Sequence, residues 1–310
     1  MSEAPEDAVL VGAAPADVTT IAGWIRQKRC VLFLGAGVHS LPPPESHYQY
    51  ADSERPRGAS ELIKHLAEMS RYADDYPDEV PNNLGRISLY FETKRPTLDR
   101  SALITEVRKL VQTGKRPSSV VRGLAALDFP LIATTNYDQL IEDALREHRK
   151  RPVISVYKRK SKESTDTYAG SEVEPTPEEP FVLKIHGDIN KEDSIVITDE
   201  DYIHFMLRMR DAGQFDPVPP VFRYQFTTYA TLFIGYSLLD YNLRLLFKAL
   251  RWEVEGGPVR PPSYAVDPKP DRLIRDVYGD QHRFVHFIVR DVWSFVPMLY
   301  RELKGTEMPE

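Results

Sequence analysis

Cysteine is nearly absent from this chain of 310 residues, in which Cys30 is the only one. A single cysteine forms no intrachain disulfide and builds no multi-cysteine zinc site. Cys30 opens an apolar run, so we expect it to pack as a small buried hydrophobic side chain. With no clustered histidines either, we expect no bound metal.

Long apolar runs and an excess of basic charge are lacking as well. No stretch approaches the ~18 apolar residues of a transmembrane helix. The first seven residues carry three acids, and no Lys or Arg precedes Arg26, unlike a secretory signal. The 40 basic side chains are outnumbered by 46 acidic ones, which leaves no overall basic surface for a phosphate backbone. We therefore expect a cytoplasmic protein that neither spans a membrane nor binds nucleic acid directly.

What the chain does contain is an alternation of apolar strand patterns and amphipathic helix patterns. Strands are predicted at 30–34, 129–133, 152–157, 181–185, 194–197, 231–234, 263–266 and 284–289. Helices are predicted at about 138–149, 200–210, 219–229 and 240–253. Such alternation is typical of parallel βαβ units. It predicts an α/β fold with an open, doubly wound, Rossmann-like and mostly parallel sheet.

Four further segments complete the expected organisation. Residues 1–16 are rich in Ala, Pro and acids, so we expect a disordered tail before one domain at 17–305. The proline-rich stretch 38–58 predicts a long loop. Helical patterns at about 60–72, 82–93, 98–113 and 119–127 follow without intervening strands, and predict a helical insertion over about 59–127. Residues 158–180 have almost no apolar content and predict a mobile surface loop.

Small and polar residues follow several of the predicted strands. Gly35, Ala36 and Gly37 end the first strand, where glycine lets the backbone approach a ligand and amides can meet phosphate oxygens. A plain tight turn is the alternative explanation. Gly235 and Ser237 follow a later strand in the same way. Because ligands bind at the carboxyl ends of strands in open α/β sheets, these turns are candidate binding elements.

Two other strand ends carry groups capable of chemistry. Thr135, Asn136 and Asp138 follow the strand at 129–133, where the alternative is that Asn136 or Asp138 only caps the next helix. His186 follows the strand at 181–185, and a lone histidine there is more often structural than catalytic. All four motifs fall at one predicted sheet edge, which favours a shared site.

The order and form of these four motifs resemble the sirtuin superfamily, in particular the sirtuin-like NAD⁺-hydrolase domains of bacterial antiphage defence systems. The similarity extends over roughly residues 20–300. It is carried by the Gly-Ala-Gly turn, the Thr-Thr-Asn-Tyr-Asp run, the Lys-Ile-His-Gly run and the Phe-Ile-Gly-Tyr-Ser-Leu run, together with Ile197 to Tyr202.

The resemblance implies a role for each matching position. Asn136 would hold the nicotinamide ribose or an attacking water, and His186 would be the general base. Asp138 would contact the carboxamide. The remaining cofactor-binding positions would be Gly35, Ala36, Gly37, Thr135, Gly235 and Ser237.

Two departures from the family pattern stand out. The family usually has a small hydroxyl residue after Gly-Ala-Gly-Val, whereas this chain has His39. His39, His47 and Tyr48 could instead cover the cofactor, although a structural role is the simpler interpretation. Deacylase sirtuins also carry a four-cysteine zinc ribbon, and here the helical insertion replaces that zinc-binding small domain. This favours NAD⁺ hydrolysis over protein deacylation.

The resulting hypothesis is an NAD⁺ glycohydrolase that forms nicotinamide and ADP-ribose and depletes NAD⁺ as an antiviral effector. NAD⁺ is then a substrate, and no metal is required. Alternatives are a non-hydrolytic sensor of NAD⁺ or ADP-ribose, an ADP-ribosyltransferase and a deacylase. By analogy with the family, we expect a homo-oligomer and a partner in trans, such as a hexameric DNA-translocase ATPase, a short Argonaute or another phage sensor.

Overall fold

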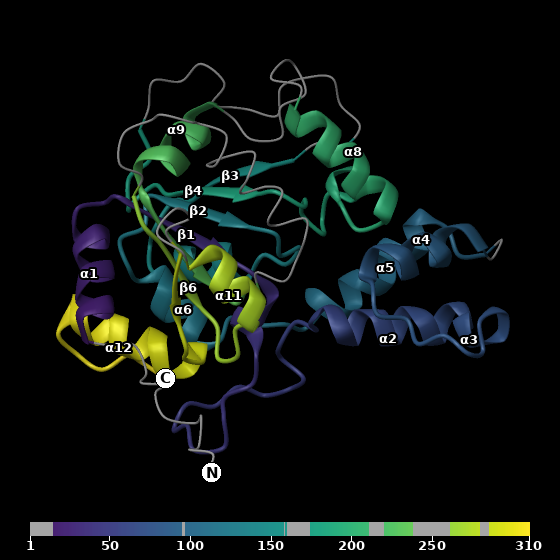
Figure 1. Ribbon diagram of the computed structural model, residues 1–310, viewed down its shortest axis with the longest axis horizontal. Helices are drawn as coiled ribbons and strands as arrows, with labels where there is room; N and C mark the ends of the chain where they lie inside the picture. The colour runs from purple at the N-terminus through teal and green to yellow at the C-terminus, as the bar shows by residue number, and fades with distance from the viewer. Residues whose placement is uncertain are drawn as a thin grey trace, which may run out of the picture.

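The computed structural model describes residues 15–94, 97–157, 159, 174–210, 220–237, 261–279 and 285–310. Its centre is a sheet of seven strands in the order β3-β4-β2-β1-β5-β6-β7, and every neighbouring pair is parallel (Figure 1). The strands are β1 (Cys30–Leu34), β2 (Leu131–Thr134), β3 (Val153–Val156), β4 (Phe181–Lys184), β5 (Ala230–Ile234), β6 (Ser263–Val266) and β7 (Val285–Ile288). The predicted Rossmann-like α/β fold is confirmed.

The strand order and register place the polar turns side by side. β1 lies in the middle, with β2 on one side and β5 on the other, so the chain changes direction across the sheet at β1. Leu34 pairs with both Thr134 and Ile234, and Thr134 pairs with Lys184. The residues that follow β1, β2, β4 and β5 therefore emerge in one row at the carboxyl edge of the sheet, where open α/β folds bind ligands.

Helices cover both faces of the sheet. Every side chain of β1, β2, β4 and β5 is therefore buried, and successive side chains along a strand face two different cores. Leu32 and Leu34 face the core formed with α1 (Pro15–Arg26), α6 (Ser119–Ala125), α7 (Leu140–Glu147) and α12 (Val292–Lys304). Phe33 faces the core formed with α8 (Asp199–Arg210), α9 (Pro220–Thr228) and α11 (Arg272–Tyr278). Cys30 is buried in the first core, as expected.

A helical arm, residues 59–111, projects to one side of the sheet (Figure 1). It contains α2 (Ala59–Ser70), α3 (Tyr72–Asp75), α4 (Leu84–Lys94) and α5 (Arg100–Val111), which surround a third core of their own. The segment expected as an insertion, about 59–127, is thus divided. Its last helix, α6, packs with α7 and α12 against the sheet.

Two arginines of α5 tie the arm to α8 and to the loop that joins β4 to α8. Arg100 Nη1 lies 2.8 Å from Asp201 Oδ2, and its Nη2 donates to the carbonyl of Ile195. Arg108 donates to the carbonyl of Ile189 at 2.7 Å. The arm is therefore fixed against the carboxyl edge of the sheet, where it can form one wall of a site.

The strand predicted at 194–197 is wrong. Residues 192–194 form a short 3-10 helix, η2, and the following residues make no strand pairing. Val196 packs in the core under α8, whereas Ile195 and Ile197 pack in the core of the arm. The apolar run thus fills the gap between sheet and arm, and apolar content alone does not distinguish that from a buried strand.

The remaining predicted elements agree with the structure within a few residues. The helices α11 and α12 were not predicted. A 3-10 helix, η1 (Ala36–His39), spans the end of the predicted glycine turn and the first two residues of the loop expected at 38–58. The predicted helix at 240–253, residues 1–14 of the tail, and positions 158 and 160–173 of the expected loop lie outside the described residues. No helix among the described residues has the length and apolar character that a membrane span needs.

Candidate active site

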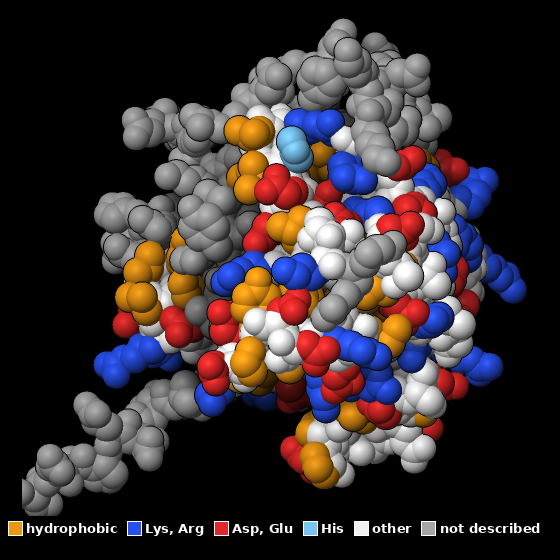
Figure 2. All heavy atoms as spheres, turned by 90° about the vertical axis from the view of Figure 1, so that its right-hand side faces the viewer, with side chains coloured by type: hydrophobic (Ala, Val, Ile, Leu, Met, Phe, Trp, Pro, Cys, Tyr) orange, Lys and Arg blue, Asp and Glu red, His pale blue; other side chains and the backbone are white. Residues whose placement is uncertain are grey.

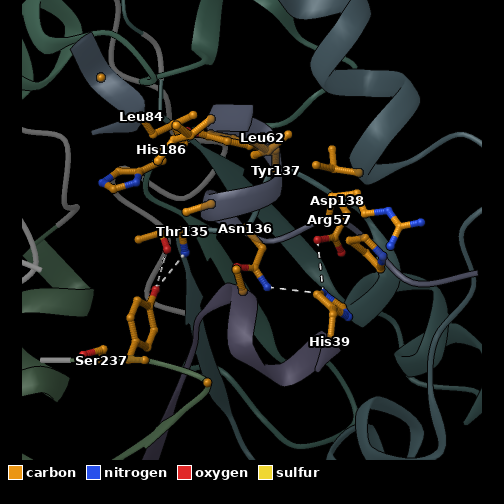
Figure 3. A pocket seen from close by; sticks show the side chains of 18 of the residues that line it. His39, Arg57, Leu62, Leu84, Thr135, Asn136, Tyr137, Asp138, His186 and Ser237 are labelled. Carbon is orange, nitrogen blue, oxygen red and sulfur yellow. Dashed lines mark hydrogen bonds and ion pairs between the residues drawn. The ribbon is translucent and has the colours of Figure 1, made fainter. Parts of the chain in front are cut away.

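A cavity of about 640 Å³ opens between the carboxyl edge of the sheet and the arm, within the range of small-molecule sites. Figure 3 shows its side chains converging from the strand ends and from α2 and α4. Seven of the nine predicted site residues line it: Ala36, Thr135, Asn136, Asp138, His186, Gly235 and Ser237. The other two, Gly35 and Gly37, are not among the lining residues.

Gly35 and Gly37 bring two turns into direct contact. The Gly35 N–H donates to Ile234 O and the Gly37 N–H to Gly235 O, both at 2.9 Å. A Cβ added to Gly35 would lie 2.5 Å from Gly235 O, and one added to Gly235 would lie 2.2 Å from Val38 N. Gly235 also has φ +74°, a conformation that favours glycine. These contacts explain the glycines without a ligand, and their contact with phosphates stays a prediction.

Asn136 and Thr135 are held by hydrogen bonds from neighbouring strands. The Oγ1 of Thr134 accepts the Asn136 N–H at 3.0 Å and donates to Leu34 O at 2.9 Å. The Thr135 N–H donates to the hydroxyl of Tyr236 at 3.1 Å, and Thr135 Oγ1 lies 2.7 Å from the same oxygen. The turns after β1, β2 and β5 are thus linked, with the Asn136 side chain at the cavity wall (Figure 3).

His186 presents a neutral imidazole to the cavity. The residue is 7% exposed, and burial lowers its pKa from 6.5 to about 3. Its ring meets Tyr202 and Phe205 edge-on, with centroids 5.2 and 5.7 Å away. No described residue hydrogen-bonds to the ring, so its nitrogen remains available to accept a proton from a ligand hydroxyl or water.

A buried lysine supports the turns that carry Asn136 and His186. Lys184 is fully buried, and its Nζ lies 2.9 Å from Glu142 and 3.1 Å from Asp188. It also donates to the carbonyls of Tyr137 and Asp138. Burial alone would lower the pKa of Lys184, but the surrounding carboxylates raise it. One cation therefore holds the loop after β2 against the loop after β4.

Position 39, which departs from the family pattern, lies inside the site. His39 is 3% exposed and lines the cavity. Its Nε2 is 3.3 Å from Asp138 Oδ2. Asp138 Oδ1 accepts the N–H of Leu140 at 3.0 Å, so Asp138 also stabilises the start of α7. Burial would raise the pKa of Asp138, but His39, Lys184 and the Leu140 N–H together lower it.

Sequence reasoning did not identify Tyr236 or Arg57 as site residues. Tyr236 lies between two predicted positions, Gly235 and Ser237, and that proximity was the available signal. Arg57 lies in the proline-rich stretch, where no motif marks it, and among the described residues it is the only Lys or Arg that lines the cavity. Its guanidinium lies 2.8 Å from Asp52 and 3.1 Å from Glu61.

No three His, Cys, Asp or Glu side chains group as metal ligands within the part of the chain that the structure describes. The strand predicted at 284–289 is present as β7, and its His286 ring stacks on Tyr264 with the ring centroids 5.4 Å apart. His282 lies outside the described residues. His47 is exposed and stacks on Tyr48, and neither of them lines the cavity.

Comparison with known protein families identifies a match over half of the chain. The SIR2-like domain family matches residues 130–286, which span β2 to β7 and include Asn136, His186 and Ser237. The chain belongs to this family. The resemblance inferred from the motifs is thereby confirmed.

Relatives of this SIR2-like domain carry names from NAD⁺ hydrolysis and defence. The chain is 31% identical over 163 residues to NAD(+) hydrolase ThsA of Enterococcus faecium, covering 53% of this chain and 30% of that protein. It is 30% identical over 215 residues to NAD(+) hydrolase ThsA of Bacillus cereus, covering 69% and 37%. Over 249 residues it is 22% identical to defense-associated sirtuin 2 of Bacillus subtilis, covering 79% and 21%. The matched part spans between about a fifth and two fifths of these relatives.

Proposed function

We propose that this SIR2-like domain hydrolyses NAD⁺ to nicotinamide and ADP-ribose, and that it acts as an antiviral effector by depleting NAD⁺. The observation that carries the proposal is the convergence of a neutral His186 and the Asn136 amide on one cavity at the carboxyl edge of the sheet. The names of the relatives, two NAD(+) hydrolases and a defense-associated sirtuin, support the same reaction and setting.

The site residues can perform each step of this reaction. A water oxygen bonds to the ribose carbon that carries nicotinamide, the carbon–nitrogen bond breaks, and its electron pair stays on the ring nitrogen. Cationic nicotinamide thereby leaves as a neutral molecule. His186 accepts the proton that the water loses, and Asn136 orients that water. The negative phosphates of the dinucleotide would offset part of the burial that lowers the pKa of His186.

The test uses the purified full chain and measures nicotinamide release from NAD⁺, alone and with the proteins encoded beside it. His186→Ala should reduce release by about 10²–10⁴-fold, because it removes the general base. His204→Ala is the matched control, since His204 lies exposed on α8 and should leave release unchanged. A folded His186→Ala variant with nearly full activity would remove His186 from the mechanism.

Asn136→Ala separates hydrolysis from binding alone. Because Asn136 acts on the water, the variant should lose turnover and keep its affinity for the dinucleotide within about tenfold, or ~1.4 kcal/mol. Calorimetry with ADP-ribose measures that affinity. A wild-type protein that binds NAD⁺ and leaves it intact under every activating condition would instead be a sensor.

We also propose that assembly or a partner in trans controls the activity. The described surface has exposed apolar side chains that are available for contacts with another protein. Ile203 and Leu207 lie one turn apart on α8 and are 52% and 60% exposed. On the face shown in Figure 2, apolar groups are interspersed with mixed acidic and basic side chains. That mixture does not favour nucleic acid as the partner on this face. Size measurement by light scattering, with and without NAD⁺, tests for self-assembly.

A further inference from the structure

One nitrogen of His39 faces two groups of the site at once. His39 Nε2 lies 3.3 Å from Asp138 Oδ2 and 3.4 Å from Asn136 Nδ2 (Figure 3). The side chain of His39 is 4% exposed, and its Nδ1 is buried without a hydrogen-bond partner among the described residues. A single ring nitrogen either donates or accepts, so it cannot satisfy a carboxylate and an amide N–H together.

The carboxylate decides which role the nitrogen takes. Asp138 also accepts the Leu140 N–H, and the carbonyl beside it accepts from the Lys184 ammonium. An ionised carboxylate offers only acceptors, so Nε2 must carry a hydrogen and donate to Asp138. An N–H of Asn136 pointing at that same hydrogen would place two donors face to face.

The amide of Asn136 can resolve this conflict by turning over. Its oxygen and nitrogen occupy nearly identical positions when the group rotates by half a turn, so the hydrogen-bond network determines the orientation. With Oδ1 toward His39, the Nε2–H is shared between Asp138 and Asn136, and the NH₂ group of Asn136 is directed to the cavity. The side chain then offers a donor to the ligand rather than an acceptor.

We propose that His39 is a positioning residue that sets this orientation of Asn136, with Asp138 acting through His39. This inference rests on the proposed function. In this orientation the Asn136 NH₂ donates to the oxygen of the attacking water. That water keeps its own hydrogens free, one of which passes to His186 as the carbon–oxygen bond forms.

Neighbouring contacts hold His39 in place for this role. His39 ends η1 (Ala36–His39), and Val38 beside it is 1% exposed. The indole N–H of Trp293, from α12, donates to the carbonyl of Ser40 at 3.0 Å. The backbone on either side of His39 is therefore held, by the burial of Val38 and by the hydrogen bond from α12 to Ser40. A small hydroxyl side chain at this position, as the family pattern has, would be too short to fill the same space.

Three variants test the proposal. His39→Leu keeps the bulk and removes both nitrogens, whereas His39→Gln keeps an N–H that can reach Asp138. His47→Leu is the control, since His47 is exposed in the same stretch. We expect His39→Leu to lower kcat for nicotinamide release by about 10–100-fold, the value of a hydrogen bond to a charged group. Affinity for ADP-ribose should change less than about threefold, with His39→Gln recovering most of the loss.

The results that would overturn the proposal are distinct. Unchanged kcat in His39→Leu excludes a positioning role. Equal losses of kcat, ADP-ribose affinity and melting temperature in both His39 variants indicate a purely structural residue.

A spectroscopic readout does not depend on turnover. Nitrogen-15 NMR of histidine-labelled wild-type protein, with the His39 signal assigned from its loss in His39→Gln, should show a hydrogen on Nε2. An Nε2 without hydrogen, and a hydrogen on Nδ1 alone, would overturn the proposal even in an inactive protein. A wild-type chain that never releases nicotinamide refutes the proposed function instead, so the two failures are distinguishable.

Discussion

At the scale of single residues, the burial of His186 has a consequence for stability. Its pKa falls from 6.5 to about 3 on folding, so between these values the unfolded chain binds a proton that the folded chain does not. Above about pH 6.5 the ring is neutral in both states, and the free energy of unfolding has its full value. The free energy of unfolding then decreases as the pH falls toward 3, with a slope of up to about 1.4 kcal/mol per pH unit, because the unfolded chain binds the proton.

Urea unfolding at pH 6.5 and pH 5 measures this effect. The free energy of unfolding of the wild type should fall by about 2 kcal/mol more than that of His186→Phe over this interval. His204→Phe, altered at an exposed position on α8, should behave as the wild type does. Equal losses in the wild type and in His186→Phe would contradict the low pKa.

Asn136 and His186 could be predicted because each follows an apolar strand in a recognisable run of residues. The contact between His39 and Asn136 could not be predicted. Asn136 is 97 positions away from His39, and nothing in the local sequence records that the two side chains meet. The turns after β1 and β2 come together only through the parallel pairing of Leu34 with Thr134. Side-chain pairing across strands is thus the information that motif reasoning lacks.

At the scale of elements, the segment entering α2 brings a positive charge to the cavity. Arg55 and Arg57 both contact Asp52 and Glu61, but only Arg57 lines the cavity. Hydrogen bonds from Arg55, rather than Arg57, are the main cause that lowers the pKa of Glu61 to about 2. Under the proposed function, Glu61 would therefore keep Arg55 as a partner if Arg57 turned to a phosphate of the dinucleotide.

Arg57→Gln should raise the KM for NAD⁺ about tenfold and leave kcat nearly unchanged, because it removes one charged hydrogen bond to the dinucleotide. Arg55→Gln is the matched control, with the same loss of charge against the same two carboxylates. Steady-state kinetics at two salt concentrations measures both variants. A larger KM change in Arg55→Gln would place the dinucleotide elsewhere.

Strand and helix predictions succeeded where the apolar periodicity was regular, and failed where tertiary packing determined the local structure. Residues 194–197 are as apolar as a strand but lie between two cores. The missed helix α12 has apolar residues at helical spacing, with Val292, Phe295, Val296 and Leu299 buried, yet it contains Pro297 in its interior. Tertiary contacts outweigh local preference in both segments.

At the scale of the whole molecule, the fold could be predicted because short, mainly apolar strand patterns alternate with helix patterns along the chain. The position of the arm could not be predicted, because it depends on ion pairs such as that of Arg100 with Asp201, 101 positions apart.

The reaction proposed for the whole chain also leads to an expectation about metal. The proposed chemistry uses side chains and water alone, and the chain has one cysteine.

Nicotinamide release should therefore be insensitive to EDTA. Elemental analysis of the purified protein should find zinc well below one atom per chain. A preparation that contains stoichiometric zinc, and that loses zinc and activity together on chelation, would contradict this prediction.

The contact between the two glycine turns affects how mutational data on this chain should be interpreted. Alanine at Gly35, Gly37 or Gly235 would place a methyl group within 3 Å of the opposing backbone. An alanine scan would register these positions as the most sensitive in the site, and lost activity would be ascribed to lost phosphate contacts. Much of that loss would be misfolding of the sheet edge. Reporters of the folded state must accompany any such scan before ligand contacts are assigned to these turns.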